Sequence, residues 1–257
     1  ALLPDGGVLV VGASSTGIQI AGELARAGRD VVLSAGDHTR MVRRYRGLDV
    51  FRWLELTGML TERVDDHPDP VRAAATPSFQ LVAGAADIDL GTCRSQGIDV
   101  AGRLLGFDGS RALFADDLAI TTARADLRLR RTLGRFDRAA ARVGHASALS
   151  DPERPAVLSV GSGPESVDLR DRGIGTIVWA TGYRRAYPWL PAAALDARGE
   201  ILHRHGVGAL PGLYVVGLRY QRHRSSNFLH GVGEDARFVV DHMTGTASPS
   251  RHLAAVP

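Results

Sequence analysis

The chain has 257 residues, of which 44% are hydrophobic and 23% charged, so it can bury the core of a globular protein. Its net charge is +3, and the sequence contains no lysine, which excludes a P-loop, a Schiff-base enzyme and a short-chain dehydrogenase. The single cysteine, Cys93, excludes an internal disulfide. No stretch approaches the ~20 apolar residues of a membrane span. We therefore expect a cytoplasmic protein with no membrane span.

An apolar run at residues 8–11, a turn of small residues and a helix start follow one another near the N-terminus. This order is typical of the first strand, phosphate loop and helix of a dinucleotide-binding βαβ unit. Gly12 is expected to make the tight turn and Gly17 to let the helix pack on the strand, while Ser14 replaces the middle glycine of G-x-G-x-x-G. The residues predicted to hold the phosphates at the helix start are Gly12, Ser14, Ser15, Thr16 and Gly17.

A second apolar run, residues 30–34, ends at Ser34, where an NAD site would place an acid for the ribose. Basic residues follow instead, which favours the 2′-phosphate of NADP; a solvated arginine-rich loop is the alternative. The basic cluster comprises His38, Arg40, Arg43, Arg44 and Arg46, and the 2′-phosphate is expected near Ser34, His38, Arg40, Arg43 and Arg44.

The middle of the chain alternates helical and extended patterns. We expect a helix over 49–58 with Trp53 in the core and a loop or lid over 64–79. Residues 98–100 with 103–107, and residues 111–114, are expected to form two strands joined by a hairpin at Asp108-Gly109. Apolar spacing predicts a helix over 123–144 with arginines on the opposite face. That face suits a nucleic acid or an acidic partner, or is simply solvated. With no nucleic-acid motif or stacking platform beside it, no nucleic-acid partner is expected.

Composition changes after this helix. Residues 148–174 are predicted to be a linker, and buried-type strands are expected at 175–183 and 211–217, followed by a helix beginning near Val232. The expected organisation is thus a first domain over 1–147, a linker over 148–174 and a C-terminal segment over 175–257. No metal site is expected.

Segments of the C-terminal part resemble a known family. Residues 180–183 (Ala-Thr-Gly-Tyr) are similar to the segment with which two-dinucleotide flavoproteins cross between their NADP and FAD domains. Residues 211–217, 225–227 and 231–233 are similar to their closing FAD-domain segment. With the Gly12 loop, this order resembles the class B flavin-dependent monooxygenases. The resemblance implies an α/β fold, with a Rossmann-like NADP-binding domain followed by the second segment of a split FAD-binding domain.

The same resemblance implies specific roles. It places the interdomain crossing at Thr181 and Gly182, and points the helix beginning near Gly231 toward the flavin, with Ser226 and Asn227 beside it. A helix-capping segment that touches no ligand is the alternative for the last two residues. The implied activity is an NADPH-dependent flavoprotein oxidoreductase of monooxygenase type, acting on a small-molecule substrate with oxygen.

The sequence departs from the family in its first FAD segment. A second G-x-G-x-x-G and the F-x-G-x-x-x-H signature are absent, and Leu218 stands where many related flavoproteins carry an aspartate. We therefore expect the C-terminal part of a longer flavoprotein, or a natural truncation. The alternative is a non-catalytic NADP-binding module, whose partner would be the missing FAD-domain segment; a homo-oligomer is also among the expected assemblies.

Overall fold

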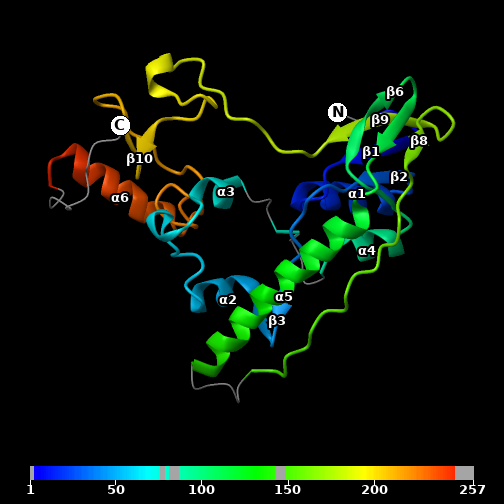
Figure 1. The fold of residues 1–257 in the computed structure, drawn as a ribbon, viewed down its shortest axis with the longest axis horizontal. Coiled ribbons are helices and arrows are strands. Elements are labelled where there is room, and N and C mark those ends of the chain that lie inside the picture. Colours follow the sequence, from blue (N-terminus) through cyan, green and yellow to red (C-terminus); the bar gives the residue numbers. More distant parts are fainter. Residues whose placement is uncertain (1–2, 76–78, 81–86, 143–148, 247–257) are drawn as a thin grey trace. The chain divides into compact units, whose positions relative to one another are not determined.

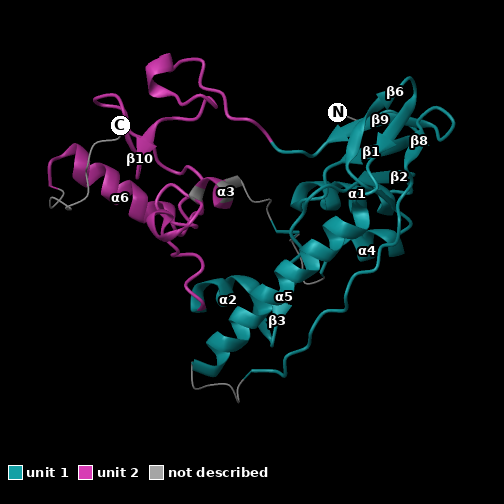
Figure 2. Ribbon diagram, in the orientation of Figure 1, with its two compact units in different colours: residues 1–56, 77–182 teal, residues 57–76, 183–257 magenta. Residues whose placement is uncertain are grey.

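The computed structural model describes residues 3–75, 79–80, 87–142 and 149–246. The chain forms two compact units, residues 1–56 with 77–182 and residues 57–76 with 183–257 (Figure 2). This division differs from the expected domain boundaries in two places. The first unit continues to residue 182 rather than 147, and residues 57–76 belong with the C-terminal part.

Four parallel strands form the central sheet of the first unit, in the order β5-β2-β1-β9 (Figure 1). Their bounds are Gly7–Val11 for β1, Val31–Ser34 for β2, Asp99–Ala101 for β5 and Ile174–Trp179 for β9. Because β1 lies between two strands and is covered on both faces, all its residues are buried. Strand β9 is at the edge and half-exposed, with Trp179 60% exposed, so it is less buried than its sequence predicts.

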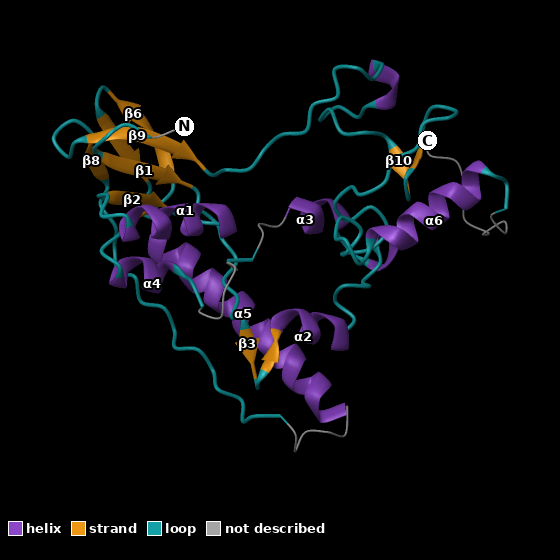
Figure 3. Ribbon diagram, turned by 180° about the vertical axis from the view of Figure 1, so that it is seen from behind, coloured by secondary structure: helices purple, strands orange, loops and turns teal. Residues whose placement is uncertain are grey.

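Two layers cover this sheet, with helices on one face and antiparallel strands on the other (Figure 3). Val8 and Val10 of β1 pack in a core with Ile18 of α1 (Ser15–Arg26). Leu9 and Val11, which point the opposite way, pack in a second core with Phe114 of β7 (Arg111–Phe114). The first unit is therefore an α/β fold of Rossmann type, as predicted.

Two further helices lie on the helical face. Helix α4 spans Leu90–Ser95 and α5 spans Leu118–Arg142. Helix α5 begins five residues earlier than predicted because Leu118, Thr121 and Thr122 already belong to its buried face. Its expected end near residue 144 lies outside the described residues.

The predicted helix near Trp53 and the predicted hairpin are both confirmed. Helix α2 spans Val50–Leu56 and follows the short antiparallel pair β3 (Arg44–Tyr45) and β4 (Leu48–Asp49). Trp53 is fully buried and stacks on Phe136 of α5, with ring centroids 5.5 Å apart. Strand β6 (Leu104–Asp108) pairs with β7 across a turn in which Gly109 has a φ of +59°.

The expected linker is interrupted by a strand. Residues 149–165 contain no helix or strand, but β8 (Ser166–Asp168) pairs with β7 and completes the sheet β6-β7-β8. Strand β9 then pairs with β1 in the central sheet. The segment thus belongs to the first unit because its backbone completes two of that unit's sheets.

The second unit has less regular structure. Its elements are the 3-10 helices η1 (Val64–Asp66) and η3 (Ala192–Ala194), helix α3 (Pro70–Ala75), the strand pair β10 (His203–Arg204) and β11 (Val207–Gly208), and helix α6 (Val232–Met243). The loop expected over 64–79 therefore contains η1 and α3, although residues 76–78 lie outside the described part. Backbone bonds from Val64 N to Arg222 O (2.7 Å) and from Ser225 N to Leu60 O (3.0 Å) tie this segment to the C-terminal part.

The strand expected over 211–217 is not formed. Tyr214 makes an isolated bridge with Val207, and Leu213, Tyr214 and Val215 remain half-exposed. An apolar run becomes a strand only when neighbouring strands take up its N–H and C=O groups. Within the described residues, no ladder forms along this segment. None of the described helices is long and apolar enough to cross a membrane.

Candidate functional site

The turn from β1 into α1 requires glycine at two positions. Gly12 has a φ of +108°, and a Cβ placed on it would lie 2.6 Å from the carbonyl oxygen of Ala180. A Cβ placed on Gly17 would lie 1.7 Å from the carbonyl oxygen of Gly12. No side chain is tolerated at either distance. The two glycines therefore make the tight turn and the close helix packing expected of them, and phosphate binding by the loop stays a prediction.

The first turn of α1 presents a positive end without an internal counter-charge. Ser14 precedes the helix in an extended conformation, and its hydroxyl makes no capping hydrogen bond. The first turn carries no acidic residue. Ser14 and Ser15 are half-buried and Thr16 is exposed. Such a helix start favours an anion through its backbone N–H groups and the helix dipole.

Gln80, which the sequence did not single out, lies beside this loop. Its side chain is fully buried, and its Nε2 donates to the carbonyl oxygen of Ala13 at 2.7 Å. Its Oε1 is buried without a hydrogen-bond partner among the described residues, as are Nε2 of His38 and Oγ1 of Thr39. Gln80 N also donates to Thr39 O, at 2.9 Å. Buried polar atoms normally have partners, so these orphaned atoms fit a site whose ligand supplies them.

Two residues expected at the 2′-phosphate have internal partners instead. The Ser34 hydroxyl donates to Gly102 O and accepts from Leu104 N, each at 2.9 Å, so it joins the end of β2 to the segment between β5 and β6. Arg40 is 6% exposed and forms ion pairs of 2.9 Å with Asp89 and 2.8 Å with Asp126. The Ser34 and Arg40 side chains therefore stabilise the fold. The residue types in the sequence do not show that these partners exist.

The other members of the basic cluster are dispersed. His38 is fully buried, and burial is the main cause that lowers its pKa below the usual value, so it is neutral near pH 7. Arg43 pairs with Asp49 at 2.8 Å, and Arg46 lies 3.6 Å from Asp137. Arg44 is exposed, and no carboxylate among the described residues pairs with it. The structure thus does not gather the five residues around one point.

Arg103, which the sequence did not single out, lies beside the segment that follows β2. A Cβ placed on Gly36, just after β2, would lie 3.7 Å from Cγ of Arg103. The Arg103 side chain is 67% exposed, and its Nε is 3.8 Å from Asp117. Arg128 of α5 also reaches this region, donating to Asp37 at 2.7 Å. Residues that follow adjacent parallel strands meet at one edge of the sheet. Because Arg103 follows β5, which pairs with β2, this rule could have predicted from the sequence that Arg103 lies near the end of β2.

The Ala-Thr-Gly segment lies against the phosphate loop. Ala180 N donates to Val11 O at 2.8 Å, and a Cβ on Gly12 would lie 3.4 Å from Thr181 N. Thr181 and Gly182 are exposed, and Gly182 has a φ of +84°. The division between the two units falls directly after Gly182, where the resemblance placed the interdomain crossing.

In the second unit, Ser226 has a structural role. Its side chain is fully buried, and its Oγ accepts hydrogen bonds from the backbone of Arg222 and of His223, each at 3.0 Å. Asn227 is exposed. A Cβ on Gly231 would lie 2.2 Å from Ser225 O, so glycine is required where α6 begins. Ser226 therefore stabilises the turn at 222–226 and does not cap α6, whose N-cap is Gly231 without a side-chain hydrogen bond. Its proximity to a flavin stays a prediction.

A buried charged group lies beside this turn. His223 Nδ1 is 3.1 Å from Ser225 Oγ, and its Nε2 is 3.2 Å from Asp235 in the first turn of α6. Arg222 lies 3.6 Å from the same carboxylate, which is fully buried. The order of hydroxyl, imidazole and carboxylate resembles a hydrolase triad, but Ser225 is 2% exposed and its hydroxyl donates to Leu60 O. Arg222 is the fixed cation nearest to the buried carboxylate of Asp235.

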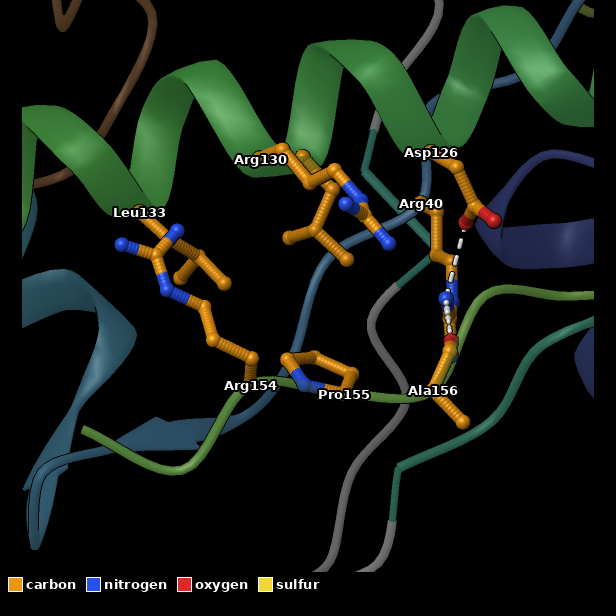
Figure 4. Close-up of a pocket in the computed structure, with 8 residues that line it drawn as sticks. Arg40, Asp126, Arg130, Leu133, Arg154, Pro155 and Ala156 are labelled. Carbon is orange, nitrogen blue, oxygen red and sulfur yellow. Dashed lines mark hydrogen bonds and ion pairs between the residues drawn. The ribbon is translucent and has the colours of Figure 1, made fainter.

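One cavity of about 250 Å³ lies in the first unit, between α5 and residues 154–156 (Figure 4). Leu129, Leu133 and Pro155 supply apolar walls, and Arg130 and Arg154 line it. Arg154 pairs with Asp137, and the guanidinium of Arg40 at the other end is occupied by its own ion pairs. Arg130 is thus the lining arginine that forms no ion pair within the described residues.

Comparisons with known proteins add two facts. No family model matches the chain. A stretch of 73 residues, 28% of this chain, is 42% identical to each of two proteins named uncharacterized oxidoreductase CzcO, from Bacillus velezensis and Bacillus subtilis, and covers 21% of each. Over 241 residues, which are 93% of its length, this chain is 25% identical to an uncharacterized oxidoreductase CzcO-like protein of Geobacillus kaustophilus. The chain spans 53% of that relative, about half its length.

Proposed function

We propose that the chain is an oxidoreductase segment that binds NADPH through the loop from Gly12 to Gly17 and supplies the second segment of an FAD-binding domain. The observation that carries this proposal is the turn from β1 into α1. Two glycines that tolerate no Cβ bring backbone N–H groups to an uncapped helix start. The names of the relatives, all oxidoreductases, support the redox class.

Within this proposal, each part of the first unit has a defined task. Backbone N–H groups of the loop after Gly12, whose own N–H donates to Ser34 O, bind the pyrophosphate, and the amide oxygen of Gln80 accepts a hydrogen bond from the cofactor. Arg103, whose side chain lies beside Gly36 just after β2, binds the 2′-phosphate. Bound NADPH would supply a hydride for flavin reduction, and the reduced flavin would supply the chemistry with oxygen and a small substrate. A cytoplasmic location belongs to the same proposal.

The FAD part of the proposal rests on the apolar run at 213–217, whose residues are half-exposed or exposed. Its backbone makes an isolated bridge and two hydrogen bonds with residues 206–208, and further neighbouring strands would extend this pairing into a ladder. We infer that those strands come from the first FAD segment of the whole protein or from a partner. Gly231 keeps the start of α6 close to Ser225.

Binding and spectroscopy test the proposal. The purified chain is titrated with NADPH and with NADH while bound flavin is sought in the visible spectrum. We expect NADPH to bind more tightly, and Arg103→Gln to weaken NADPH binding by about 10- to 100-fold, as for loss of one charged hydrogen bond. NADH binding should be unchanged, and Arg26→Gln, an exposed arginine at the end of α1, should leave both affinities unchanged.

The possible outcomes separate the two functions. Flavin colour that bleaches with NADPH would demonstrate a redox unit in this chain alone. Colourless protein that binds NADPH without oxidising it would favour the non-catalytic NADP module. Absence of binding to either nucleotide would refute the proposed cofactor site.

A further inference from the structure

Five exposed arginines form one line along α5. They are Arg124, Arg131, Arg135, Arg138 and Arg142, here called the arginine row. Their spacings of seven, four, three and four residues place them within a sector of about 60° around the helix axis, since each residue turns the helix by about 100°. The row is about 27 Å long at 1.5 Å per residue.

The charge of the row is not neutralised by the described protein. None of its members pairs with a carboxylate among the residues that the structure describes. The two acidic residues of α5, Asp126 and Asp137, lie on other faces and bind Arg40 and Tyr45. Arg128, which lies beside the row, shows the contrast, because it pairs with Asp37 at 2.7 Å.

The rest of α5 fixes the direction of the row. Leu129, Leu133 and Phe136 on the opposite face are buried, each 2% exposed or less. The helix therefore cannot rotate to hide its arginines, and its apolar face is not available to enter a lipid bilayer. What remains is a rigid line of guanidinium groups on the surface of the first unit.

We propose that the arginine row binds the phosphate backbone of a nucleic acid without recognising bases. Guanidinium groups suit phosphates because they donate paired hydrogen bonds in a planar fork. Along 27 Å of duplex axis one strand offers about eight phosphates, enough for five arginines. A membrane surface presents a plane of charge rather than a line, and the exposed apolar side chains on this side of α5, Ile120 and Leu127, lie in its N-terminal half, away from the arginines between Arg131 and Arg142. The lack of aromatic residues in the row excludes base stacking, consistent with backbone contacts alone.

The sequence predicted no nucleic-acid partner because it contains no recognition motif. The structure adds that the arginines are collinear, exposed and without described counter-charges. Non-specific backbone binding requires only these three properties.

Salt dependence tests the proposal. The chain is titrated into a fluorescein-labelled duplex of arbitrary sequence between 50 and 200 mM salt, and binding is followed by anisotropy. Five phosphate contacts predict a slope of log K against log salt concentration of about −4.5. The binding constant should therefore fall by about 500-fold between 50 and 200 mM salt. The triple variant Arg131→Gln, Arg135→Gln, Arg138→Gln should reduce the slope to about −1.8, about a 12-fold loss.

A matched variant controls for net charge. Arg26→Gln, Arg184→Gln and Arg198→Gln together remove the same charge from other exposed sites and should leave the slope unchanged. Glutamine has nearly the helix propensity of arginine, so these substitutions should leave α5 folded. If the triple variant of the row does not fold, the single variant Arg135→Gln replaces it in the test, with an expected slope of about −3.6. Equal effects of both triple variants would refute the proposal. Binding to phosphatidylserine vesicles but not to the duplex would also refute it.

Discussion

Arg40 links two carboxylates inside the first unit, and replacing it distinguishes a structural role from a cofactor-binding role. Its partners Asp89 and Asp126 have side chains that are 12% and 6% exposed. Arg40→Met keeps an unbranched apolar stem but leaves two carboxylates without their cation. Removing one partner of a buried ion pair costs about 3–5 kcal/mol, a large part of the stability of a typical domain.

Urea unfolding followed by circular dichroism measures this loss. Arg44→Met, at an exposed site in the same cluster, should change the free energy of unfolding by less than about 0.5 kcal/mol. Adding Asp126→Asn to Arg40→Met removes one stranded charge, keeps an acceptor for Leu158 N–H, and should recover part of the loss. The reasoning would be refuted if Arg40→Met unfolded like the wild type and instead lost its preference for NADPH over NADH.

Three further predictions follow from individual side chains. Gly17→Ala places a methyl group on the carbonyl oxygen of Gly12 and should lower the free energy of unfolding by more than about 3 kcal/mol. Gly28→Ala is the control, because Gly28 has a φ of +78° but open space around it, and this variant should lower the free energy of unfolding by about 1 kcal/mol. Both values come from the same urea unfolding experiment. Burial raises the pKa of the Cys93 thiol to about 12, so a maleimide at pH 7.5 should label it only after unfolding; rapid labelling of the folded chain would contradict its burial. Burial, and then the hydrogen bond to a neighbouring carboxylate, raise the pKa of Tyr45 to about 12, so its stabilising contribution is complete below pH 10 and is lost as the pH rises to 12. Difference titration of tyrosinate absorbance against Tyr45→Phe measures this, and ionisation of Tyr45 near pH 10 would contradict it.

Local patterns predicted the elements whose partners are close in sequence. The apolar run at 8–11, Gly12 and Gly17 identified β1, the phosphate loop and α1, because strand burial, a positive φ and helix packing each restrict residue type directly. Gly109 identified the hairpin for the same reason. The helical spacing of Leu129 and Leu133 identified α5, although the start of that helix depended on burial of its first turn.

Long-range pairing changed the interpretation of the rest. The sequence grouped Arg40 with other basic residues, but carboxylates 49 and 86 residues away make it an internal ion-pair partner. Residues 174–179 and 211–217 have similar apolar patterns. The first run pairs with β1, while the second finds no ladder among the described residues.

The sequence by itself determined the α/β class and the location of the phosphate loop, since both depend on residue periodicity and on glycine at fixed positions. The tertiary structure alone decided which side chains remain available for a ligand. It occupied Ser34 and Arg40 with internal partners, and it placed Gln80 beside Ala13 and Arg103 beside Gly36. The physical reason is that hydrogen bonds and ion pairs depend on distance in space, which residue type and spacing do not fix for segments far apart in the chain.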